Sequence, residues 1–445
     1  MFSLRSFVLT YLCTYSLLAI PTYGSDPTHP EHHHHRYSER LKKSTAKRTK
    51  HSQPSSTSET HCQRRSYVLS PVRNVLAYRP WDDGFSISKL FQSVENETNA
   101  QITVDFTILP QWFHPKKALG STIEEKYPAW QFYMSPSVSW KMYDSPTAGV
   151  GSLDFSYTLV RYWRNTAENV NNTIGIAGGI NDYSSRTNTL SQLTFSQTFP
   201  GNFLTVSIGQ YSLYAIDGTA YDNDQQSGFL SYALSQNASA TYSLGSVGAY
   251  LQFTPTETIN IQAGFQDAYN IIGTTFDVHN LTKNKYNYYG YASWAPKCKL
   301  GNGQYSILYY STRKVPAQPT KTKGWSFNFG QNLSEKLYIF GRWNRATGTA
   351  VNFNRSYVLG LASADPIHRN PQDLFGAACA LSKVNPKVVT GQKIREYETV
   401  FETFATIGFG PHISLTPDFQ LYLHPARRPE KRTARVYGIR ANFST

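Results

Sequence analysis

Apolar and polar residues alternate one by one in many short segments of this chain. In the segment TPDFQLYL, Phe419 and Leu421 lie on one face of an extended backbone. Gln420 and Tyr422 lie on the other face. A period of two residues predicts a β-strand with one apolar face and one polar face. The last segment, RVYGIRANF, follows the same rule, so the chain is predicted to consist of strands whose two faces meet different surroundings.

Alternating segments recur from Ala100 to the end of the chain, with turn residues between them. The segment VGAYLQFTPTETINIQAGFQDAY predicts a hairpin, with Leu251 on its first arm and Ile261 on its second. At roughly 20–23 residues for a strand and its connection, residues 99–445 have room for about sixteen strands. Two all-β architectures fit. In a secreted β protein the apolar faces form a core, whereas in a membrane barrel they face lipid.

One segment ahead of the strands has helical periodicity instead. Its apolar residues are spaced three and four positions apart, namely Ile87, Leu90, Phe91 and Val94. Ser86 precedes them and is a suitable N-cap. We predict one short amphipathic helix within residues 76–98 and no other helix.

The N-terminus has the pattern of a secretory signal. Arg5 precedes the apolar run FVLTYLCTYSLLAI, and Gly24 follows at the spacing of a signal-peptidase site. We assign residues 1–24 to a signal peptide that is removed on export. No later stretch reaches about 18 consecutive apolar residues, so an exported chain that enters a membrane is expected to cross it as strands.

Residues 25–75 form a basic, His- and Ser-rich extension with few apolar residues. This composition predicts disorder. Its ten Lys/Arg and four Asp/Glu supply nearly half of the net charge of +14. An exported basic tail meets anionic lipid or polymer rather than nucleic acid. A bare histidine tract is only a compositional hint of metal binding, so we assign no metal site and no cofactor; the weak candidates are His32, His33, His34 and His35.

The composition favours lipid over a protein core as the surroundings of the apolar faces. Aromatic residues make up 14% of the chain, with 31 Tyr and 25 Phe, while the mean hydropathy is −0.44. In a barrel, apolar and polar positions cancel along each strand, and aromatic residues gather at both membrane interfaces. We therefore predict an all-β fold over residues 99–445, a transmembrane antiparallel β-barrel of about 16 strands with a short N-terminal helix. Such a barrel leaves an aqueous channel.

Six segments of the chain, in this order, resemble blocks of one known family: WDDGFSISKL, LSQLTFSQTFPGNFLTVSIGQYS, FLSYALSQNASATYSLGSVGAYLQFTPTETINIQAGFQDAYN, KLYIFGRWNR, DPIHRNPQDLFGAA and YETVFETFATIGFGPHISLTPDFQLYLHPA. Together they resemble the carbohydrate-selective outer-membrane porins, the OprB family. The resemblance implies a barrel that passes sugars by passive diffusion without covalent chemistry. The chain departs from the family at residues 25–75, and at Gly209-Gln210, where the family has a basic residue after the glycine.

A sugar path needs aromatic rings for the C–H faces of the sugar and charged or amide side chains for its hydroxyls. The lumen-facing positions that alternation predicts for this path are Tyr338, Phe340, Arg342, Glu398, Glu402, Gln420, Tyr422 and Arg440. Arg369 and Asp373 lie in a connection that is a candidate for an inward-folded constriction. Each charge also has a structural interpretation, because ion pairs on the lumen face can stiffen the wall without selecting a solute.

These patterns predict an outer-membrane porin of a Gram-negative-type bacterium, not an enzyme, with the extension on the periplasmic side. The sequence contains no Gly-x-Ser-x-Gly elbow. Two alternatives stay open. Residues 76–445 still carry a net charge of +7, which suits a general or anion-preferring pore. A surface antigen or adhesin role is compatible with any barrel.

The expected partners are sugars, outer-membrane lipid and the barrel-assembly machinery, which would recognise the last strand through Phe443. Ser444 and Thr445 follow that residue, which departs from the usual aromatic ending. We expect a monomer or a trimer. The spacing does not determine whether any two of Cys62, Cys298 and Cys379 pair.

Overall fold

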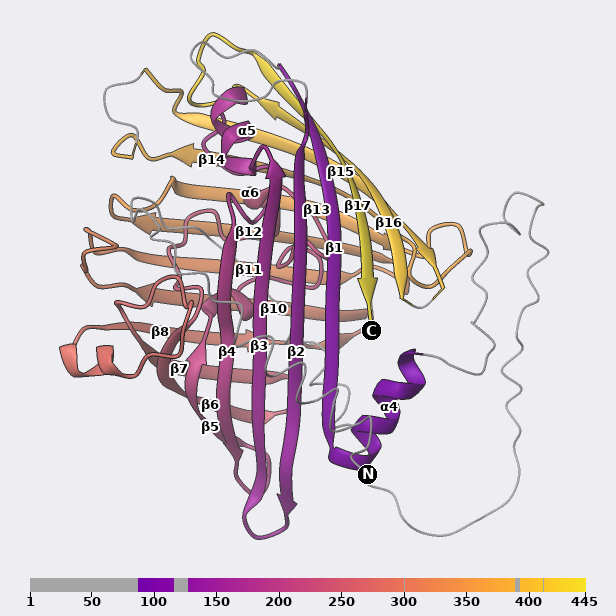
Figure 1. Ribbon diagram of the computed structural model, residues 1–445, viewed down its shortest axis with the longest axis vertical. Helices are drawn as coiled ribbons and strands as arrows, with labels where there is room; N and C mark the ends of the chain where they lie inside the picture. The colour runs from indigo at the N-terminus through magenta and orange to yellow at the C-terminus, as the bar shows by residue number, and fades with distance from the viewer. Residues whose placement is uncertain (1–86, 116–126, 300, 389–392, 411) are drawn as a thin grey trace.

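The alternating segments pair into one antiparallel sheet that closes on itself (Figure 1). The computed structural model describes residues 87–115, 127–299, 301–388, 393–410 and 412–445. Within these ranges sixteen long strands form the wall of a barrel. They are β1 (Ala100–His114), β2 (Ala129–Ser145), β3 (Gly149–Arg164), β4 (Thr187–Thr198), β5 (Leu204–Tyr211), β6 (Ser246–Thr256), β7 (Ile259–Asp267), β8 (Tyr286–Trp294), β10 (Gly301–Ser311), β11 (Lys323–Asn332), β12 (Leu337–Thr347), β13 (Phe353–Ala364), β14 (Leu374–Val384), β15 (Tyr397–Phe409), β16 (Ile413–Leu423) and β17 (Thr433–Ser444).

The barrel is closed by pairing of the first strand with the last. Phe106 of β1 lies opposite Phe443 of β17 and also opposite Met134 of β2. The two-residue strand β9 (Lys297–Cys298) pairs with the start of β10 and is not part of the wall. In Figure 1, β1–β4 run across the strands of the opposite wall, as tilted barrel strands do. A closed sheet has no free edge, and the prediction of about sixteen strands is confirmed.

The outer surface of the barrel is apolar, as alternation predicts. On β17, Tyr437 and Ile439 are 45% and 41% exposed, whereas Val436 and Arg440 are buried inside. Aromatic side chains gather on this outer surface as well. Trp325 and Trp343, for example, are 4.5 Å apart between ring centroids on β11 and β12. The apolar face of each strand therefore points away from the lumen, where a barrel in a membrane meets lipid.

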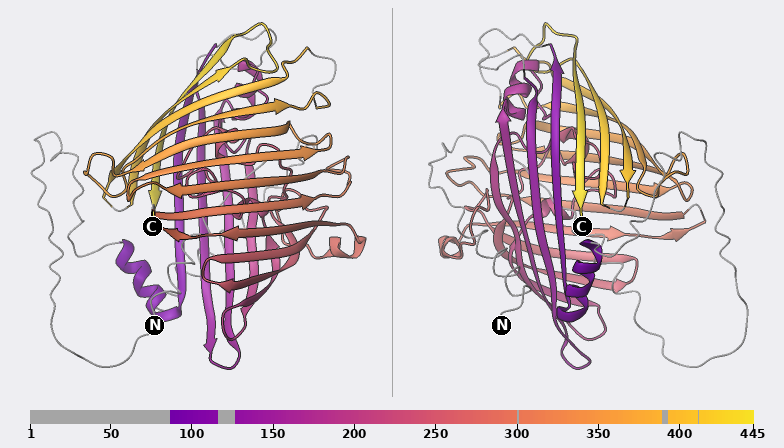
Figure 2. Two further views of the ribbon diagram at one scale, coloured as in Figure 1. Left: turned by 180° about the vertical axis from the view of Figure 1, so that it is seen from behind. Right: turned by 45° about the vertical axis from the view of Figure 1, so that its right-hand side comes forward.

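The two ends of the barrel differ in the length of their connections. One end, called the turn end here, has short connections such as residues 146–148, 257–258 and 333–336. The other, called the loop end, has the long connections 165–186, 212–245 and 268–285. Short turns of such barrels face the periplasm and long loops face the exterior. The helix α4 and the C-terminus lie at the turn end (Figure 2).

The predicted helix is present, but the prediction of a single helix was wrong. The helix α4 (Ile87–Thr98) covers the expected segment. Two more helices lie in the long connections, α5 (Ala167–Ile174) and α6 (Tyr232–Ser235), with 3-10 turns η2 (Leu213–Ala215) and η3 (His279–Lys283). Both helices are too short to show a helical period in sequence. No helix in the described part of the chain is long and apolar enough to span a membrane.

The helix α5 is determined by local capping. The Thr166 side chain accepts a hydrogen bond from the backbone N–H of Asn169, whose side chain accepts one from the backbone N–H of Thr166. Gly175 ends the helix in the left-handed conformation, with φ of 77°. A Cβ at this glycine would also collide with the side chain of Arg428. The chain therefore leaves α5 at Gly175 and turns into the barrel.

Two segments fold back from the loop end into the lumen. The short insert (residues 175–186) joins α5 to β4, and the long insert (residues 212–245) joins β5 to β6 and contains α6 (Figure 1). Nearly every residue from 227 to 248 is buried. Apolar side chains of both inserts, such as Ile180, Phe229 and Leu234, share one buried cluster with lumen-facing residues of the wall. The interior of the barrel is therefore occupied by chain segments held against its wall.

Candidate functional site

The strand β12 places three of the predicted residues toward the lumen. Tyr338, Phe340 and Arg342 are buried on the inner face, whereas Trp343 points outward and is 44% exposed. The Tyr338 ring packs against Tyr221 of the long insert, with centroids 5.2 Å apart. The Phe340 ring packs against Phe229 of the same insert at 5.6 Å. Both aromatic residues therefore contact the long insert.

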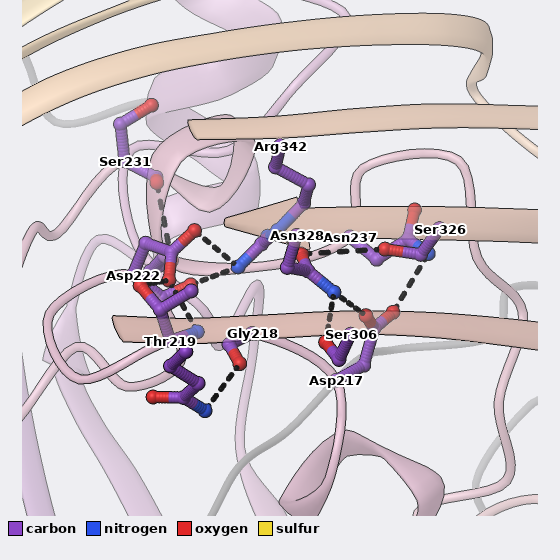
Figure 3. A network of polar contacts seen from close by, with 12 residues as sticks. Asp217, Gly218, Thr219, Asp222, Ser231, Asn237, Ser306, Ser326, Asn328 and Arg342 are labelled. Atoms are coloured by element: carbon purple, nitrogen blue, oxygen red, sulfur yellow. Dashed lines mark hydrogen bonds and ion pairs between the residues drawn. The ribbon is translucent and has the colours of Figure 1, made fainter. Parts of the chain in front are cut away.

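Arg342 is the centre of a buried polar network (Figure 3). Its Nη2 lies 2.9 Å from Oδ2 of Asp222 in the long insert, and both side chains are completely buried. Its Nε donates a hydrogen bond of 2.9 Å to Oδ1 of Asn328 on β11. Nη2 also donates to the backbone carbonyl of Asp222. The guanidinium thus joins the wall to the long insert by a desolvated ion pair.

The network continues from Asn328 to Asp217. The Nδ2 of Asn328 donates to Oδ1 of Asp217 at 2.9 Å, and the Tyr242 hydroxyl donates to its Oδ2 at 2.7 Å. Asn237 donates to the same Oδ2 at 2.8 Å. Asp217, Asn237 and Tyr242 all belong to the long insert, so these bonds hold its two ends together beside β11.

The strand β15 holds one insert with each of its two inward glutamates. Glu398 accepts hydrogen bonds from the backbone N–H groups of Ala177 at 2.8 Å and Gly178 at 3.1 Å, both in the short insert. It also accepts one from the N–H of Ala426 at 3.0 Å. Glu402 accepts hydrogen bonds from Ser231 at 2.8 Å and from Leu230, both N–H groups of the long insert. Each carboxylate satisfies backbone donors that would otherwise be buried without partners.

The predicted residues of β16 and β17 also contact the inserts. The side-chain amide of Gln420 donates to the carbonyl of Ile180 at 3.0 Å. The Tyr422 hydroxyl donates to the carbonyl of Gly179 at 3.1 Å. Nη1 of Arg440 donates to the carbonyl of Gly228 at 2.9 Å. Lumen-facing side chains of β15, β16 and β17 therefore form hydrogen bonds with backbone groups of both inserts.

Arg369 and Asp373 lie elsewhere, in the connection between β13 and β14 at the turn end. Arg369 Nε donates to Asp373 Oδ2 at 2.8 Å, and Nη2 donates to the carbonyl of Gly408 at 3.0 Å. The N–H of Gly408 donates to Asp373 at 2.9 Å. These bonds fasten the connection to the end of β15. The segments folded into the lumen come from the loop end, which corrects the expectation of an inward constriction here.

A residue that sequence analysis missed, Asp182, joins the two inserts to each other. Its carboxylate accepts hydrogen bonds from the backbone N–H of Gln225 at 3.1 Å, from the side chain of Gln236 at 3.0 Å and from the Ser235 hydroxyl. Burial raises the pKa of Asp182 from 3.8 to about 7, although these hydrogen bonds favour the charged form. Asp182 therefore titrates near neutral pH at the contact between the inserts.

Hydrogen exchange of the backbone of residues 231–237 is expected to slow by up to about 30-fold when the pH falls from 8 to 5.5. The pKa of Asp182 is higher in the docked inserts than in released ones, so docking binds a proton. Docking is tightest below the released pKa and weakens as the pH rises to about 7. The measurement is deuterium exchange with rates corrected for their intrinsic pH dependence. Asp182→Asn should remove most of the change, and an unaltered dependence in this variant would contradict the assignment.

The length of the long insert is visible in the sequence. The strand segments NFLTVSIGQY and VGAYLQF are separated by residues 212–246, several times the usual connection of about 4–6 residues, without clear alternation between them. A structureless stretch of this size inside a compact domain is uncommon and is often functional. That spacing identifies an insert, although it does not locate its contacts.

The buried charged residues are mainly acidic. Among the residues that the structure describes, ten carboxylates and three guanidinium groups are buried. The carboxylates are Asp154, Asp182, Asp217, Asp222, Asp224, Asp267, Asp373, Glu398, Glu402 and Asp418, and the guanidinium groups are Arg342, Arg369 and Arg440. The excess positive charge of the chain is therefore not in the barrel interior.

The described residues contain no group of three or more His, Cys, Asp or Glu side chains arranged to hold a metal ion. The tract from His32 to His35 lies outside those residues, as do the assigned signal peptide and the extension over residues 25–75. Cys298 and Cys379 are free thiols, and Cys62 is also outside the described residues.

The sequence and the fold both match known proteins. The family model described as carbohydrate-selective porin, OprB family, matches residues 163–444. Porin AaxA of Chlamydia felis is 73% identical over 440 residues, covering 99% of each chain. Porin AaxA of Chlamydia abortus is 72% identical over 448 residues, covering 100% of each chain. Porin AaxA of Chlamydia trachomatis serovar D is 48% identical and covers 99% of this chain and 100% of its own.

Among solved structures, the high-pH structure of Pseudomonas putida OprB has the same fold. Its TM-score is 0.64 at 14% identity, and the match covers 83% of this chain and 99% of that one. The matching family model extends from the end of β3 to the end of β17, which includes both inserts. The chain belongs to the OprB family of carbohydrate-selective porins.

Proposed function

We propose that the barrel passes small, uncharged, hydroxyl-rich solutes, above all sugars, across the outer membrane by passive diffusion. Its family and fold make the chain an outer-membrane porin, a channel rather than an enzyme. We propose that the route of these solutes runs between the inserts and the wall strands β2–β7.

The observation that carries this proposal is the chemistry of the lumen face near the turn end. The half-buried side chains there include hydroxyls and an amide, namely Ser139, Thr198, Thr205 and Gln252. They form short polar ladders across neighbouring strands, such as the 2.9 Å contact between the hydroxyls of Thr198 and Thr205. Hydroxyls and amides both donate and accept hydrogen bonds, as sugar hydroxyls require. Each bond exchanges for one to water, so binding is weak enough for passage.

The buried carboxylates argue against the anion-preferring alternative. In the described residues the buried carboxylates outnumber the buried guanidinium groups by seven (10 − 3), and those carboxylates that are ionised make the interior unfavourable for a negative solute. The net positive charge, which suggested that alternative, lies mainly outside this interior. We therefore expect neutral solutes to pass more easily than anions of the same size.

Liposomes that contain the refolded chain are expected to swell faster in glucose than in gluconate, by several-fold. The two solutes have nearly the same size, so the difference reports charge. Glucosamine is added as a cation of similar size. A neutral dipeptide of similar mass serves as the control for hydroxyl content. Equal rates for glucose and the dipeptide would indicate a general porin, and faster gluconate entry would favour the anion-preferring alternative.

The positions of α4 and β17 support two further proposals, one for the side of the membrane on which the extension lies and one for the recognition of the last strand. The helix α4 contacts β1 at the turn end, so we place the extension that precedes it on the periplasmic side. The last strand, β17, pairs with β1 and carries Phe443 near its end. We propose that the barrel-assembly machinery recognises this strand before it closes the sheet. We also propose that the chain acts as a monomer or a trimer.

A further inference from the structure

We propose that the outer wall of the barrel has a binding site for the phosphate groups of the glycolipid in the outer leaflet of the membrane. The site consists of Arg345 on β12, Arg355 on β13 and Lys383 on β14. It is independent of the solute that the pore passes, because all three residues lie on the lipid-facing side of the wall.

The three basic residues stand in one row across three adjacent strands. Arg345 is directly opposite Arg355, and Arg355 is directly opposite Lys383. Arg345 and Arg355 are exposed on the outer face, and Lys383 is partly exposed. Residues directly opposite each other in an antiparallel pair have Cβ atoms about 4.5–5.5 Å apart, and like charges at this distance destabilise the pair. An anion bound between these basic side chains would relieve the repulsion.

Protein groups neutralise only part of this row. Lys383 Nζ lies 2.7 Å from Oε1 of Glu396, whose side chain is 64% exposed. Such an exposed ion pair is weak. Lys383 also lies 5.6 Å from the centroid of the Tyr397 ring. Among the described residues, the structure records no side-chain hydrogen bond or ion pair for Arg345 or Arg355. At least two positive charges are therefore available to an external anion.

The depth of the row in the membrane follows from its aromatic neighbours. Trp343 stacks on Tyr357 with ring centroids 6.2 Å apart and an interplanar angle of 15°. Trp343 lies two positions before Arg345 on β12, and Tyr357 lies two positions after Arg355 on β13. All four residues are on the same outer face. Interfacial aromatic residues lie at the level of the headgroups. Two residues along a strand advance about 7 Å toward the loop end, which brings the basic row to the level of the lipid phosphates.

The chemistry of the row selects phosphate over other anions in that layer. Guanidinium groups present parallel N–H donors that match the oxygens of a phosphate. The outer leaflet of an outer membrane is rich in lipid A, which carries two phosphates on one disaccharide. One of these phosphates can lie between the neighbouring arginines of β12 and β13. The structure thus assigns this face of the barrel to a bisphosphorylated glycolipid.

The test uses the full refolded chain and two probes, bisphosphorylated lipid A and the same lipid after removal of its phosphates. Native mass spectrometry across a titration gives the Kd of each. We expect the double variant Arg345→Gln/Arg355→Gln to bind bisphosphorylated lipid A about tenfold or more weakly than the wild type. The dephosphorylated lipid should bind the wild type and the variant equally weakly.

The matched control is Arg435→Gln. Arg435 is an outward-facing arginine of β17 at the same end, opposite Leu421 and His114 rather than another arginine or lysine. It should leave the Kd within about twofold of the wild type. Equal loss in this control, wild-type affinity in the double variant, or equal affinity for the dephosphorylated lipid would each overturn the proposal.

Thermal unfolding separates binding from a structural role of the two arginines. In zwitterionic phospholipid without lipid A, the double variant should unfold at the same temperature as the wild type or higher, since it loses a repulsion. Addition of bisphosphorylated lipid A should raise the unfolding temperature of the wild type more than that of the variant. A lower unfolding temperature of the variant in zwitterionic lipid would show that the arginines hold the fold itself, and would also overturn the proposal.

Discussion

Replacement of Glu402 with alanine is expected to raise the single-channel conductance of the barrel about twofold or more, because the long insert loses its hold on the wall. Glu402 is 3% exposed and accepts hydrogen bonds from the backbone N–H groups of Leu230 and Ser231. Truncation leaves both donors buried without a partner, at about 1–3 kcal/mol each. The measurement is conductance in planar bilayers, combined with protease cleavage of the long insert.

Two variants make this result specific. Glu402→Gln keeps the shape and one acceptor oxygen, so it should give an intermediate conductance. Glu335→Ala removes an exposed glutamate from a short connection at the turn end and should leave the conductance unchanged. An unchanged conductance and an unchanged cleavage pattern in Glu402→Ala would show that the other contacts, such as those of Arg440, suffice to hold the insert.

Replacement of Arg342 with methionine is expected to destabilise the docked long insert by about 3–5 kcal/mol, since it leaves the carboxylate of Asp222 buried and uncompensated. Both side chains of this pair are fully buried, so solvent does not screen the loss. Methionine keeps most of the volume of the side chain. Thermal unfolding in detergent reports the stability of the barrel, and liposome swelling reports the effect on the path.

A double-mutant cycle separates the pair from its surroundings. Asp222→Asn in the Arg342→Met background should restore part of the lost stability, because no buried charge is then left alone. Arg345→Met changes the same residue type three positions along β12 on the outer face, and in detergent it should have little effect. If the two arginine variants lose equal stability, the buried ion pair is not the cause.

These contacts explain how a wide barrel can form a narrow path. Sixteen strands enclose a channel that their own side chains cannot fill. The inserts fill part of it, and their backbone N–H and C=O groups are satisfied by side chains of the wall, including Glu398, Glu402 and Tyr422. The charged residues of β12 and β15 therefore act first through the inserts. Their effect on solutes depends on where they hold these segments.

The sequence alone determined the fold and the face of each strand. A strand has a period of two residues, so Arg342 and Phe340 had to share one face and Trp343 had to take the other. Water and lipid impose opposite preferences on the two faces, so the polar positions of a strand predict which of its side chains line the lumen. Arg369 and Asp373 lie four positions apart in one connection, so their ion pair could also be predicted from the sequence.

The tertiary structure decided what the lumen-facing side chains do. Glu402 binds Leu230 across 172 positions, Glu398 binds Ala177 across 221, and Arg342 binds Asp222 across 120. Alternation shows that a side chain points inward, but it does not show which segment it meets there. The inserts have no period, and their path is set by buried backbone groups that need partners wherever the wall offers them. For this porin, periodicity along the chain therefore determined the wall, and hydrogen-bond satisfaction in the closed barrel determined what occupies it.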